Sequence, residues 1–416
     1  MKTNIWILNH YASGMYFDHG GRHYNFAKYL RRAGYAPVVF GANSKHGKAE
    51  RFFETAALWE EHIAEEIETP FVFVRARTYT GNGKQRVLNM IDFYRNVKTA
   101  AKEYAAQHGK PDVIFASSVH PLTLVAGIQL AKQFGVKCVC EVRDLWPESI
   151  VAYSDRFTKN NPLIRLLYRG EKRIYKKADA LVFTMEGAYD YIVEQGWDKE
   201  IPRAKVHYIN NGVDLEQFDY NKENFPVDDP ELLNPELFKI VFAGTLVLSN
   251  NIDGMLDLAK RLQKYPNVRF LIWGNGEYTE SMLRRIDNEQ INNVCYKGFV
   301  DKKYVPFIVS HADVNFMHAA PTSLYRYGAS PNKLFDYLAA GCPIMQDFTF
   351  NGDIVSKYAC GVSCDWDLDR VEQAFDELYH ANAEQCAAMR EGALKAATDY
   401  DFANLTRKLI SIIERN

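Results

Sequence analysis

A segment in the last third of the chain combines residue types that favour anion binding. Residues 330–341 read Ser-Pro-Asn-Lys-Leu-Phe-Asp-Tyr-Leu-Ala-Ala-Gly. Ser330 is a good N-cap, Pro331 suits the first helical position, and Gly341 is typical of a helix end. The free N–H groups of such a helix start can bind a phosphate, which would also explain Lys333 in a turn where the dipole repels cations. A structural helix with a solvated Lys333 fits the same pattern.

Small and polar residues follow two predicted strands nearby. Thr245 comes shortly after the apolar run Lys239–Ala243, and Gly274 and Gly276 come directly after Val268–Trp273. Glycines at the end of a strand let the backbone approach a nucleotide closely. An ordinary tight turn is the alternative explanation for these two glycines.

Polar side chains also follow strands in the first half of the chain. Arg143, Asp144 and Glu148 come after the apolar run Lys137–Val142, and His120 comes after another strand. Such residues at the carboxyl ends of strands lie where α/β proteins bind ligands. The alternatives are a structural ion pair of Arg143 with Asp144 or Glu148, and a structural role for His120.

The elements that must position these residues alternate between short apolar runs and amphipathic helices. This alternation predicts an α/β fold with two doubly wound, parallel-sheet domains. Strands are expected first at the following ranges: Ile5–Asn9, Ala36–Gly41, Phe71–Arg75, Asp112–Ser117, Lys137–Val142, Ala180–Thr184 and Val206–Ile209. In the second half they are expected at Lys239–Ala243, Val268–Trp273, Val294–Lys297, Ala312–Met317 and Pro343–Gln346.

The proline-rich stretch Gln217–Glu236 interrupts this alternation and is typical of a loop or linker. We therefore expect a first domain over residues 1–216, a linker over 217–238, a second domain over 239–398 and an amphipathic helix over 399–416 that returns to the first domain. Two open parallel sheets joined in this way can face each other across a cleft, which suits an enzyme with two substrates.

Several segments resemble the retaining GT-B glycosyltransferases of family GT4. Residues 330–341 are similar to the donor-binding helix of that family, and Arg143–Ser149 (Arg-Asp-Leu-Trp-Pro-Glu-Ser) is similar to the subgroup that builds O-antigen and capsule units, including fucosamine transferases. The resemblance covers nearly the whole chain. It implies that Asp336 binds the donor ribose and that Gly298-Phe299 contacts the base. It also relates Gly20 and Gly21 to the glycine-rich loop where phosphate or acceptor approaches.

The chain departs from the family pattern at two places. The family usually carries a glutamate eight positions before the residue at Asp336, where this chain has Gly328. The family's diphosphate-binding Arg and Lys are also missing after Gly244, where the chain has Thr245 and then Ser249. Because charge on the leaving group must be offset, we expect Arg326 and Lys333 to replace them.

The resemblance further implies a reaction. A sugar, expected to be a UDP-linked N-acetylated hexose, would move to a lipid-linked or saccharide acceptor with retention, without a metal or cofactor. Ser330, Asn332 and Lys333 would bind the phosphates, while Arg143, Asp144 and His120 would lie near the reacting sugar. Gly20, Gly21 and Glu148 would lie on the acceptor side.

Two segments could contact the acceptor or a membrane. Leu163–Lys177 is a basic amphipathic stretch that could lie on an anionic membrane, or whose apolar side could pack on the sheet. Tyr79–Arg86, a Gly-rich stretch before a helix, is the better acceptor-loop candidate.

Composition excludes several other classes. A net charge of −2 disfavours a general nucleic-acid binder, and no run approaches the roughly 20 apolar residues of a membrane span. The first residues do not fit a signal peptide, so a cytoplasmic protein is expected. Seven cysteines without metal-ligand spacing indicate reduced core thiols, with Cys138 and Cys140 on one strand face. Asp365-Trp366-Asp367 fits a helix cap better than a metal site.

Three other functions are compatible with the same architecture and motifs. A UDP-sugar epimerase or a phosphorylase could use the same architecture, and Gly328 with the missing phosphate cations would also fit a non-catalytic nucleotide-sugar-binding subunit. A dinucleotide oxidoreductase is disfavoured, because no Gly-x-Gly-x-x-Gly follows the first strand.

Overall fold

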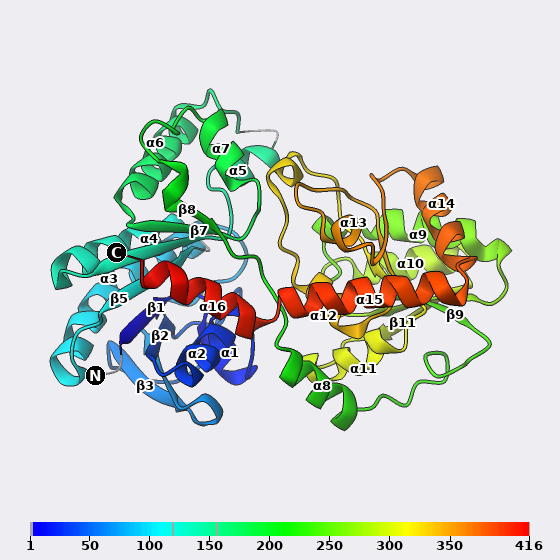
Figure 1. Ribbon diagram of the computed structural model, residues 1–416, viewed down its shortest axis with the longest axis horizontal. Coiled ribbons are helices and arrows are strands. Elements are labelled where there is room, and N and C mark those ends of the chain that lie inside the picture. Colours follow the sequence, from blue (N-terminus) through cyan, green and yellow to red (C-terminus); the bar gives the residue numbers. More distant parts are fainter. Residues whose placement is uncertain (1–2, 119, 155–156, 416) are drawn as a thin grey trace. The chain divides into compact units, whose positions relative to one another are not determined.

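A computed structural model describes residues 3–118, 120–154 and 157–415 (Figure 1). Val119, within the stretch Ser117–His120, lies outside the described residues. The chain forms two compact units. The first unit consists of Met1–Asn210 together with Phe402–Asn416, and the second unit is Asn211–Asp401.

The first unit is built on an eight-stranded sheet with the order β3-β4-β2-β1-β5-β6-β7-β8. All neighbouring strands are parallel except β3, which pairs antiparallel with β4. The strands are β1 Asn4–Leu8, β2 Ala36–Ala42, β3 Trp59–Ala64, β4 Thr69–Val74, β5 Val113–Ser118, β6 Lys137–Val142, β7 Ala180–Phe183 and β8 Val206–Tyr208. Helices cover the sheet, so β1 and β5 are almost entirely buried, as continuous apolar runs in parallel sheets are.

Helices of the first unit connect these strands and lie against the sheet (Figure 1). They are α1 Ser13–Phe17, α2 Arg22–Arg32, α3 Lys84–His108, α4 Pro121–Phe134, α5 Glu148–Ala152, α6 Pro162–Lys177, α7 Ala188–Glu194 and α16 Phe402–Ile413. The last helix, α16, lies beside α2. Phe402 packs edge-on against Phe26 at 5.5 Å between ring centroids, and the Tyr35 hydroxyl donates to Glu414 Oε1 at 2.5 Å. The expectation that the final helix returns to the first domain is confirmed.

The second unit is a six-stranded, fully parallel sheet with the order β11-β10-β9-β12-β13-β14. Its strands are β9 Phe238–Ala243, β10 Val268–Trp273, β11 Val294–Gly298, β12 Val314–Met317, β13 Ile344–Gln346 and β14 Gly361–Ser363. Its helices are α8 Leu215–Asn224, α9 Ile252–Arg261, α10 Thr279–Glu289, α11 Val305–Ser310, α12 Asn332–Ala340, α13 Ile354–Tyr358, α14 Leu368–Tyr379 and α15 Ala383–Asp399. Two doubly wound α/β units therefore confirm the predicted fold class.

The structure differs from the sequence expectation in three elements. Strands β3 and β14 were not expected, because β3 is a half-polar edge strand and β14 has only three residues. The stretch expected as a loop begins with helix α8, whose first turn is capped by the Asp214 side chain accepting from Gln217 N. The contacts also divide the units at residue 210, six residues before the boundary expected from composition.

Four further observations concern membrane spans, metal sites, a helix cap and a cysteine pair. Among the described residues, none of the helices has both the length and the apolar character required to cross a membrane. In the same described part of the chain, no group of three or more His, Cys, Asp or Glu side chains could hold a metal ion. Asp367 caps α14 by accepting from Arg370 N, as predicted, and the buried Cys138 and Cys140 sulfurs lie 3.7 Å apart on one strand face.

Candidate functional site

The loops at the carboxyl edge of the second sheet hold most of the residues that the sequence assigned to the donor. Because β9, β10, β12 and β13 are parallel, the segments that follow them meet at one edge. Helix α12 begins near the same edge, where Tyr337 of that helix accepts a hydrogen bond from Ala243 N at the end of β9 (3.1 Å).

Helix α12 begins later than predicted. It starts at Asn332 with Pro331 in the N-cap position, and no side chain caps it. Ser330 is therefore not the cap. Its hydroxyl oxygen accepts from Asn211 N at 3.1 Å, and Asn332 Oδ1 accepts from Asn211 Nδ2 at 2.7 Å. Asn211 thus holds the loop before the helix. No side chain caps the start of α12, and the Leu334 N–H bonds back to the Pro331 carbonyl oxygen at 3.3 Å. Gly341 ends the helix in the left-handed region, as predicted.

Lys333 points its ammonium group at the loops after β9 and β12. Nζ donates to Asn250 Oδ1 and to the His318 carbonyl oxygen, both at 3.2 Å, and lies 4.3 Å from the centroid of the Phe242 ring. Its partners among the described residues are neutral, and no described carboxylate forms an ion pair with it. Burial therefore lowers the pKa of Lys333 to about 7, although the more distant Asp347 opposes the shift. A bound anion would restore the full charge of this amine.

His318, whose carbonyl oxygen accepts a hydrogen bond from Lys333, forms a buried pair with Asp347. His318 and Asp347 are fully buried, and their side chains form a short hydrogen bond between Nδ1 and Oδ2. The other imidazole nitrogen of His318 bonds to the Asn251 carbonyl oxygen at 2.6 Å. Both ring nitrogens of His318 are thus engaged by protein oxygens, which fixes the orientation of the ring. Sequence reasoning did not identify this pair, because its members are 29 residues apart.

Asp336 lies on the next turn of α12. Its side chain is half-buried and makes no hydrogen bond to any described residue. Burial raises the pKa of its carboxyl, and Lys302 partly offsets the rise. Phe299, directly after β11, is 66% exposed and forms an aromatic surface open to a ligand. An unpartnered carboxylate and an exposed ring are groups that can contact a ribose and a base.

The remaining predicted donor residues have mixed surroundings. A Cβ at Gly274 would lie 1.8 Å from Gly244 O, and one at Gly276 would lie 2.1 Å from Leu246 O. Both glycines are thus required where the loops after β9 and β10 pack together. Thr245 is exposed, and its carbonyl accepts from Asn250 Nδ2 at 2.6 Å. Arg326 is exposed on a 3₁₀ turn and donates to the Tyr327 hydroxyl at 2.5 Å, whereas Lys333 donates to Asn250 and to the His318 carbonyl, so the role of Arg326 beside Lys333 stays a prediction.

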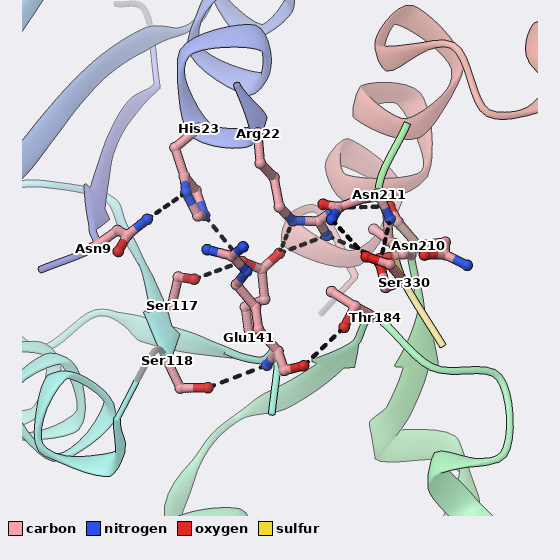
Figure 2. A network of polar contacts seen from close by, with 12 residues as sticks. Asn9, Arg22, His23, Ser117, Ser118, Glu141, Thr184, Asn210, Asn211 and Ser330 are labelled. Carbon is pink, nitrogen blue, oxygen red and sulfur yellow. Dashed lines mark hydrogen bonds and ion pairs between the residues drawn. The ribbon is translucent and has the colours of Figure 1, made fainter. Parts of the chain in front are cut away.

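The first unit contains a buried polar network that sequence reasoning missed (Figure 2). Glu141, inside the apolar strand β6, is fully buried. Its Oε1 accepts from Arg22 Nε at 2.7 Å, and its Oε2 accepts from His23 Nε2 at 2.9 Å and from the Ser117 hydroxyl at 2.6 Å. Burial alone would raise the pKa of Glu141, but Arg22 and His23 hold it far below its usual range.

The same network fixes the proton on His23 and ties two segments together. His23 Nδ1 accepts from Asn9 Nδ2 at 2.8 Å while Nε2 donates to Glu141, which defines the neutral ring with the proton on Nε2. Burial lowers the pKa of His23, which agrees with a neutral ring. Arg22 also donates to the carbonyls of Ile209 and Asn210, at 2.9 and 2.6 Å. Every polar group in this centre is used, which is the property of a structural network.

Arg143 and Asp144 follow β6 at the carboxyl edge of the first sheet. The Ser118 and Thr184 hydroxyls hold the Arg143 backbone, at 3.1 Å to its nitrogen and 3.2 Å to its oxygen. The Arg143 guanidinium donates to no described residue, so the ion-pair alternative for Arg143 is wrong within the described chain. Asp144 is exposed.

His120 lies in a cluster of imidazole and aromatic rings. It is 1% exposed, and its Nε2 lies 2.6 Å from His10 Nδ1. Burial, together with the charge of Arg86, lowers the pKa of His120 to about 3, so the ring is neutral. The buried Nδ1 of His120 and Nε2 of His10 have no hydrogen-bond partner among the described residues. Tyr79, from the expected acceptor loop, is buried close by.

The predicted acceptor-side residues have structural contacts. Gly21 precedes α2 with φ +95°, a conformation that favours glycine, and Gly20 N donates to Met15 O at 3.3 Å. Glu148 is buried and accepts from the Tyr168 hydroxyl at 2.5 Å and from Lys159 Nζ at 2.9 Å. These contacts explain Glu148 without a ligand, and its role in acceptor binding stays a prediction.

Two relatives among curated proteins match part of the chain. The protein named "Putative teichuronic acid biosynthesis glycosyltransferase TuaH" of Bacillus subtilis (strain 168) is 28% identical over 50% of this chain and 49% of its own length. The processive diacylglycerol alpha-glucosyltransferase of Acholeplasma laidlawii is 26% identical over 36% of this chain and 44% of its own length. The chain thus matches about half the length of each relative or less.

Solved structures share the whole fold at low identity. The alpha,alpha-trehalose 6-phosphate synthase from Burkholderia multivorans superposes with a TM-score of 0.69 at 14% identity, covering 99% of this chain and 98% of that one. Anabaena HepE in complex with UDP superposes with a TM-score of 0.63 at 12% identity, covering 99% of both chains. At these identities the likeness establishes the GT-B type of fold.

Two family models account for most of the sequence. The model of Glycosyltransferase Family 4 matches residues 22–217, and that of Glycosyl transferases group 1 matches residues 226–396. Each match falls mainly on one of the two α/β units. The chain therefore belongs to the glycosyltransferases of family GT4.

Proposed function

We propose that the protein transfers a sugar from a nucleotide diphosphate donor to an acceptor hydroxyl, with retention at the anomeric carbon. The donor is a UDP-linked N-acetylated hexose. The acceptor is a lipid-linked or saccharide molecule of bacterial surface polysaccharide synthesis, as in the O-antigen and capsule subgroup. Resemblance to that subgroup and the teichuronic acid relative support this choice. The reaction needs neither metal nor cofactor, since the nucleotide sugar is itself a substrate.

Lys333 is the observation that carries the proposal. It places an amine without an ionic partner among the described residues beside the start of α12, which no side chain caps, and its lowered pKa supports a bound anion as the missing partner. A diphosphate at this position would receive hydrogen bonds from Lys333 and from the first N–H groups of the helix. These donors would stabilise the charge that develops as the diphosphate leaves.

Two other residues of the second unit, Asp336 and Phe299, complete the proposed donor site. Asp336 accepts the ribose hydroxyls, and the Phe299 ring stacks on the base. In the first unit, Arg143 and Asp144 orient the reacting sugar or acceptor, because both residues follow β6 at the carboxyl edge of the sheet, where Ser118 and Thr184 hold the Arg143 backbone. We place the protein in the cytoplasm, with a peripheral association at the inner face of the plasma membrane.

A donor panel tests this function directly. Thermal unfolding is followed with UDP-, GDP- and TDP-linked sugars and with NAD, all at the same high concentration. A ligand that binds and is present at about a hundred times its dissociation constant adds roughly 2.7 kcal/mol to the free energy of unfolding. A UDP-sugar should raise the melting temperature and NAD should not. Product analysis with and without acceptor then separates transfer from its rivals. Donor turnover without acceptor would indicate an epimerase, and donor binding without turnover for any acceptor would indicate a binding subunit.

A further inference from the structure

A groove runs between α4 and α6 on the surface of the first unit, with a volume of about 470 Å³. Six side chains supply most of its apolar lining: Leu122, Val125 and Ile128 from α4, and Leu166, Leu167 and Ile174 from α6. Trp146, from the loop after β6, also lines it. On α6, Leu166 and Leu163 remain 60% and 54% exposed, although Ile164 and Ile174 are buried. The helix therefore packs on the sheet and still presents apolar surface to an outside molecule.

The charges at this groove are positive. Arg173 and Lys177 line it, are exposed, and donate to no described residue. Glu171, the acid in the lining, is 4% exposed, and its two oxygens accept from the Tyr175 and Tyr191 hydroxyls at 2.7 and 2.6 Å. Burial raises the pKa of Glu171 to about 8, so this acid is mostly neutral at pH 7. An occupant thus meets an apolar channel with two unpaired cations.

Two other basic residues of α6 are paired with protein. Lys172 and Lys176 form ion pairs with the two oxygens of Glu200, and neither lines the groove. Arg165 and Arg169 are exposed and do not line the groove either, so Arg173 and Lys177 are the basic residues of α6 that face it. A helical rise of 1.5 Å per residue puts Leu166 and Lys177 about 16 Å apart along the groove, which is long enough for an extended hydrocarbon chain.

We propose that this groove binds the hydrocarbon chain of an anionic membrane lipid, with its phosphate held by Arg173 and Lys177. The volume falls within the range of ligand sites, and the apolar lining and unpaired cations match the two parts of such a molecule. Lysine and arginine at the end of an apolar surface also attract anionic headgroups. This site anchors the first unit to the membrane and does not depend on the proposed sugar transfer.

The direct test is titration of the full chain with alkyl phosphates below their micelle concentrations. Dodecyl phosphate should bind and change the fluorescence of Trp146, and Trp146→Phe should remove that signal. Each two methylenes between octyl and dodecyl phosphate should tighten binding roughly tenfold, because the chain is buried. Inorganic phosphate alone should not bind measurably. Affinity independent of chain length would overturn the proposal.

Gly170 offers a matched pair of variants. It lines the groove on α6, and a Cβ built there meets nothing within 4 Å, so a larger side chain enters the groove without displacing protein. Gly170→Phe should weaken dodecyl phosphate binding at least tenfold, whereas Gly170→Ala should change it less than twofold. Unchanged binding in Gly170→Phe, with thermal unfolding showing an intact fold, would contradict the site.

Charge reversal separates the groove from general attraction to a basic helix. Arg173→Glu with Lys177→Glu should abolish flotation with phosphatidylglycerol vesicles, while Lys172→Glu with Lys176→Glu should reduce it far less, although both double variants change the charge equally. Pure phosphatidylcholine vesicles should not float the wild type. Equal loss in both double variants would show an unspecific surface and refute the proposal. Donor-induced thermal shifts should persist in all of these variants, and their absence in the wild type would count against the proposed function alone.

Discussion

Two polar centres of this protein differ in how completely their groups are paired. In the first unit, Glu141, Arg22 and His23 are buried and use every hydrogen-bonding atom on protein partners. In the second unit, Lys333 meets only neutral oxygens, Asp336 bonds to no described residue, and no side chain caps the start of α12. We interpret the fully paired network of the first unit as a part of the fold, and the incompletely paired groups around Lys333 as the proposed anion site.

The largest expected effect is on stability and comes from substituting Glu141 in the fully paired network of the first unit. Glu141→Gln removes the charge that pairs with Arg22 and leaves a buried guanidinium without a counterion. We expect the free energy of unfolding to fall by about 3–5 kcal/mol, measured by urea denaturation. Glu200→Gln, which removes an exposed acid from two lysines, serves as the control and should leave stability essentially unchanged. Equal stabilities for wild type and Glu141→Gln would refute the structural role of this centre.

Substitution of Lys333 in the second unit should lower the affinity for the donor and leave the stability of the fold nearly unchanged. Lys333→Met keeps an apolar stem over the Phe242 ring and removes the ammonium. Loss of charged hydrogen bonds worth about 1.5–3 kcal/mol should weaken UDP-sugar binding roughly 10- to 100-fold in calorimetry. The melting temperature without ligand should stay within a few degrees, since a buried amine of lowered pKa contributes little to folding. Full affinity in this variant would remove Lys333 from the site.

The pH dependence of binding sharpens the contrast further. With its pKa at about 7, Lys333 loses its proton in the free protein as the pH rises above 7, while a bound diphosphate raises that pKa. Binding therefore takes up a proton, and UDP-sugar affinity should fall by up to tenfold per pH unit between pH 7 and 9. A UDP-sugar is the right probe because its diphosphate does not titrate in this range. Lys333→Met should show a flat profile, and an equal slope in both proteins would contradict the assignment.

Asp336 should give the smallest effect. Asp336→Asn keeps the shape but weakens the acceptor, so UDP-sugar affinity should fall about fivefold, or roughly 1 kcal/mol. With a donor that lacks the ribose 2′-hydroxyl, the same substitution should cost less, because one of the proposed hydrogen bonds is already gone. Equal losses with both donors would place the carboxylate away from the ribose.

The sequence predicts the fold well where apolar runs are long. The strands Val268–Trp273 and Lys137–Val142 appear with the predicted bounds, because each is a nearly continuous apolar run. The edge strand Trp59–Ala64 was missed, since its Glu-Glu-His core resembles a loop.

The contacts of the polar residues in the two units could be predicted from the sequence only where they are local in the chain. Lys333 could be identified from a conflict with the helix dipole that is local in the chain. Ser330 was wrongly assigned as a cap, because Asn211, 119 residues away, supplies the donor that its hydroxyl accepts. Glu141 was not predicted either, although a glutamate in an apolar strand is an unusual signal, and its partner Arg22 is also 119 residues distant. Contacts over such separations come from topology, which a local pattern does not contain.

The most direct test of the central claim is a solved complex with UDP-N-acetylglucosamine. The account predicts the diphosphate oxygens at about 2.7–3.2 Å from Lys333 Nζ and from the first N–H groups of α12. It also predicts the ribose at Asp336 and the uracil against Phe299. A diphosphate bound elsewhere, with Lys333 still facing only Asn250 and the His318 carbonyl, would contradict it.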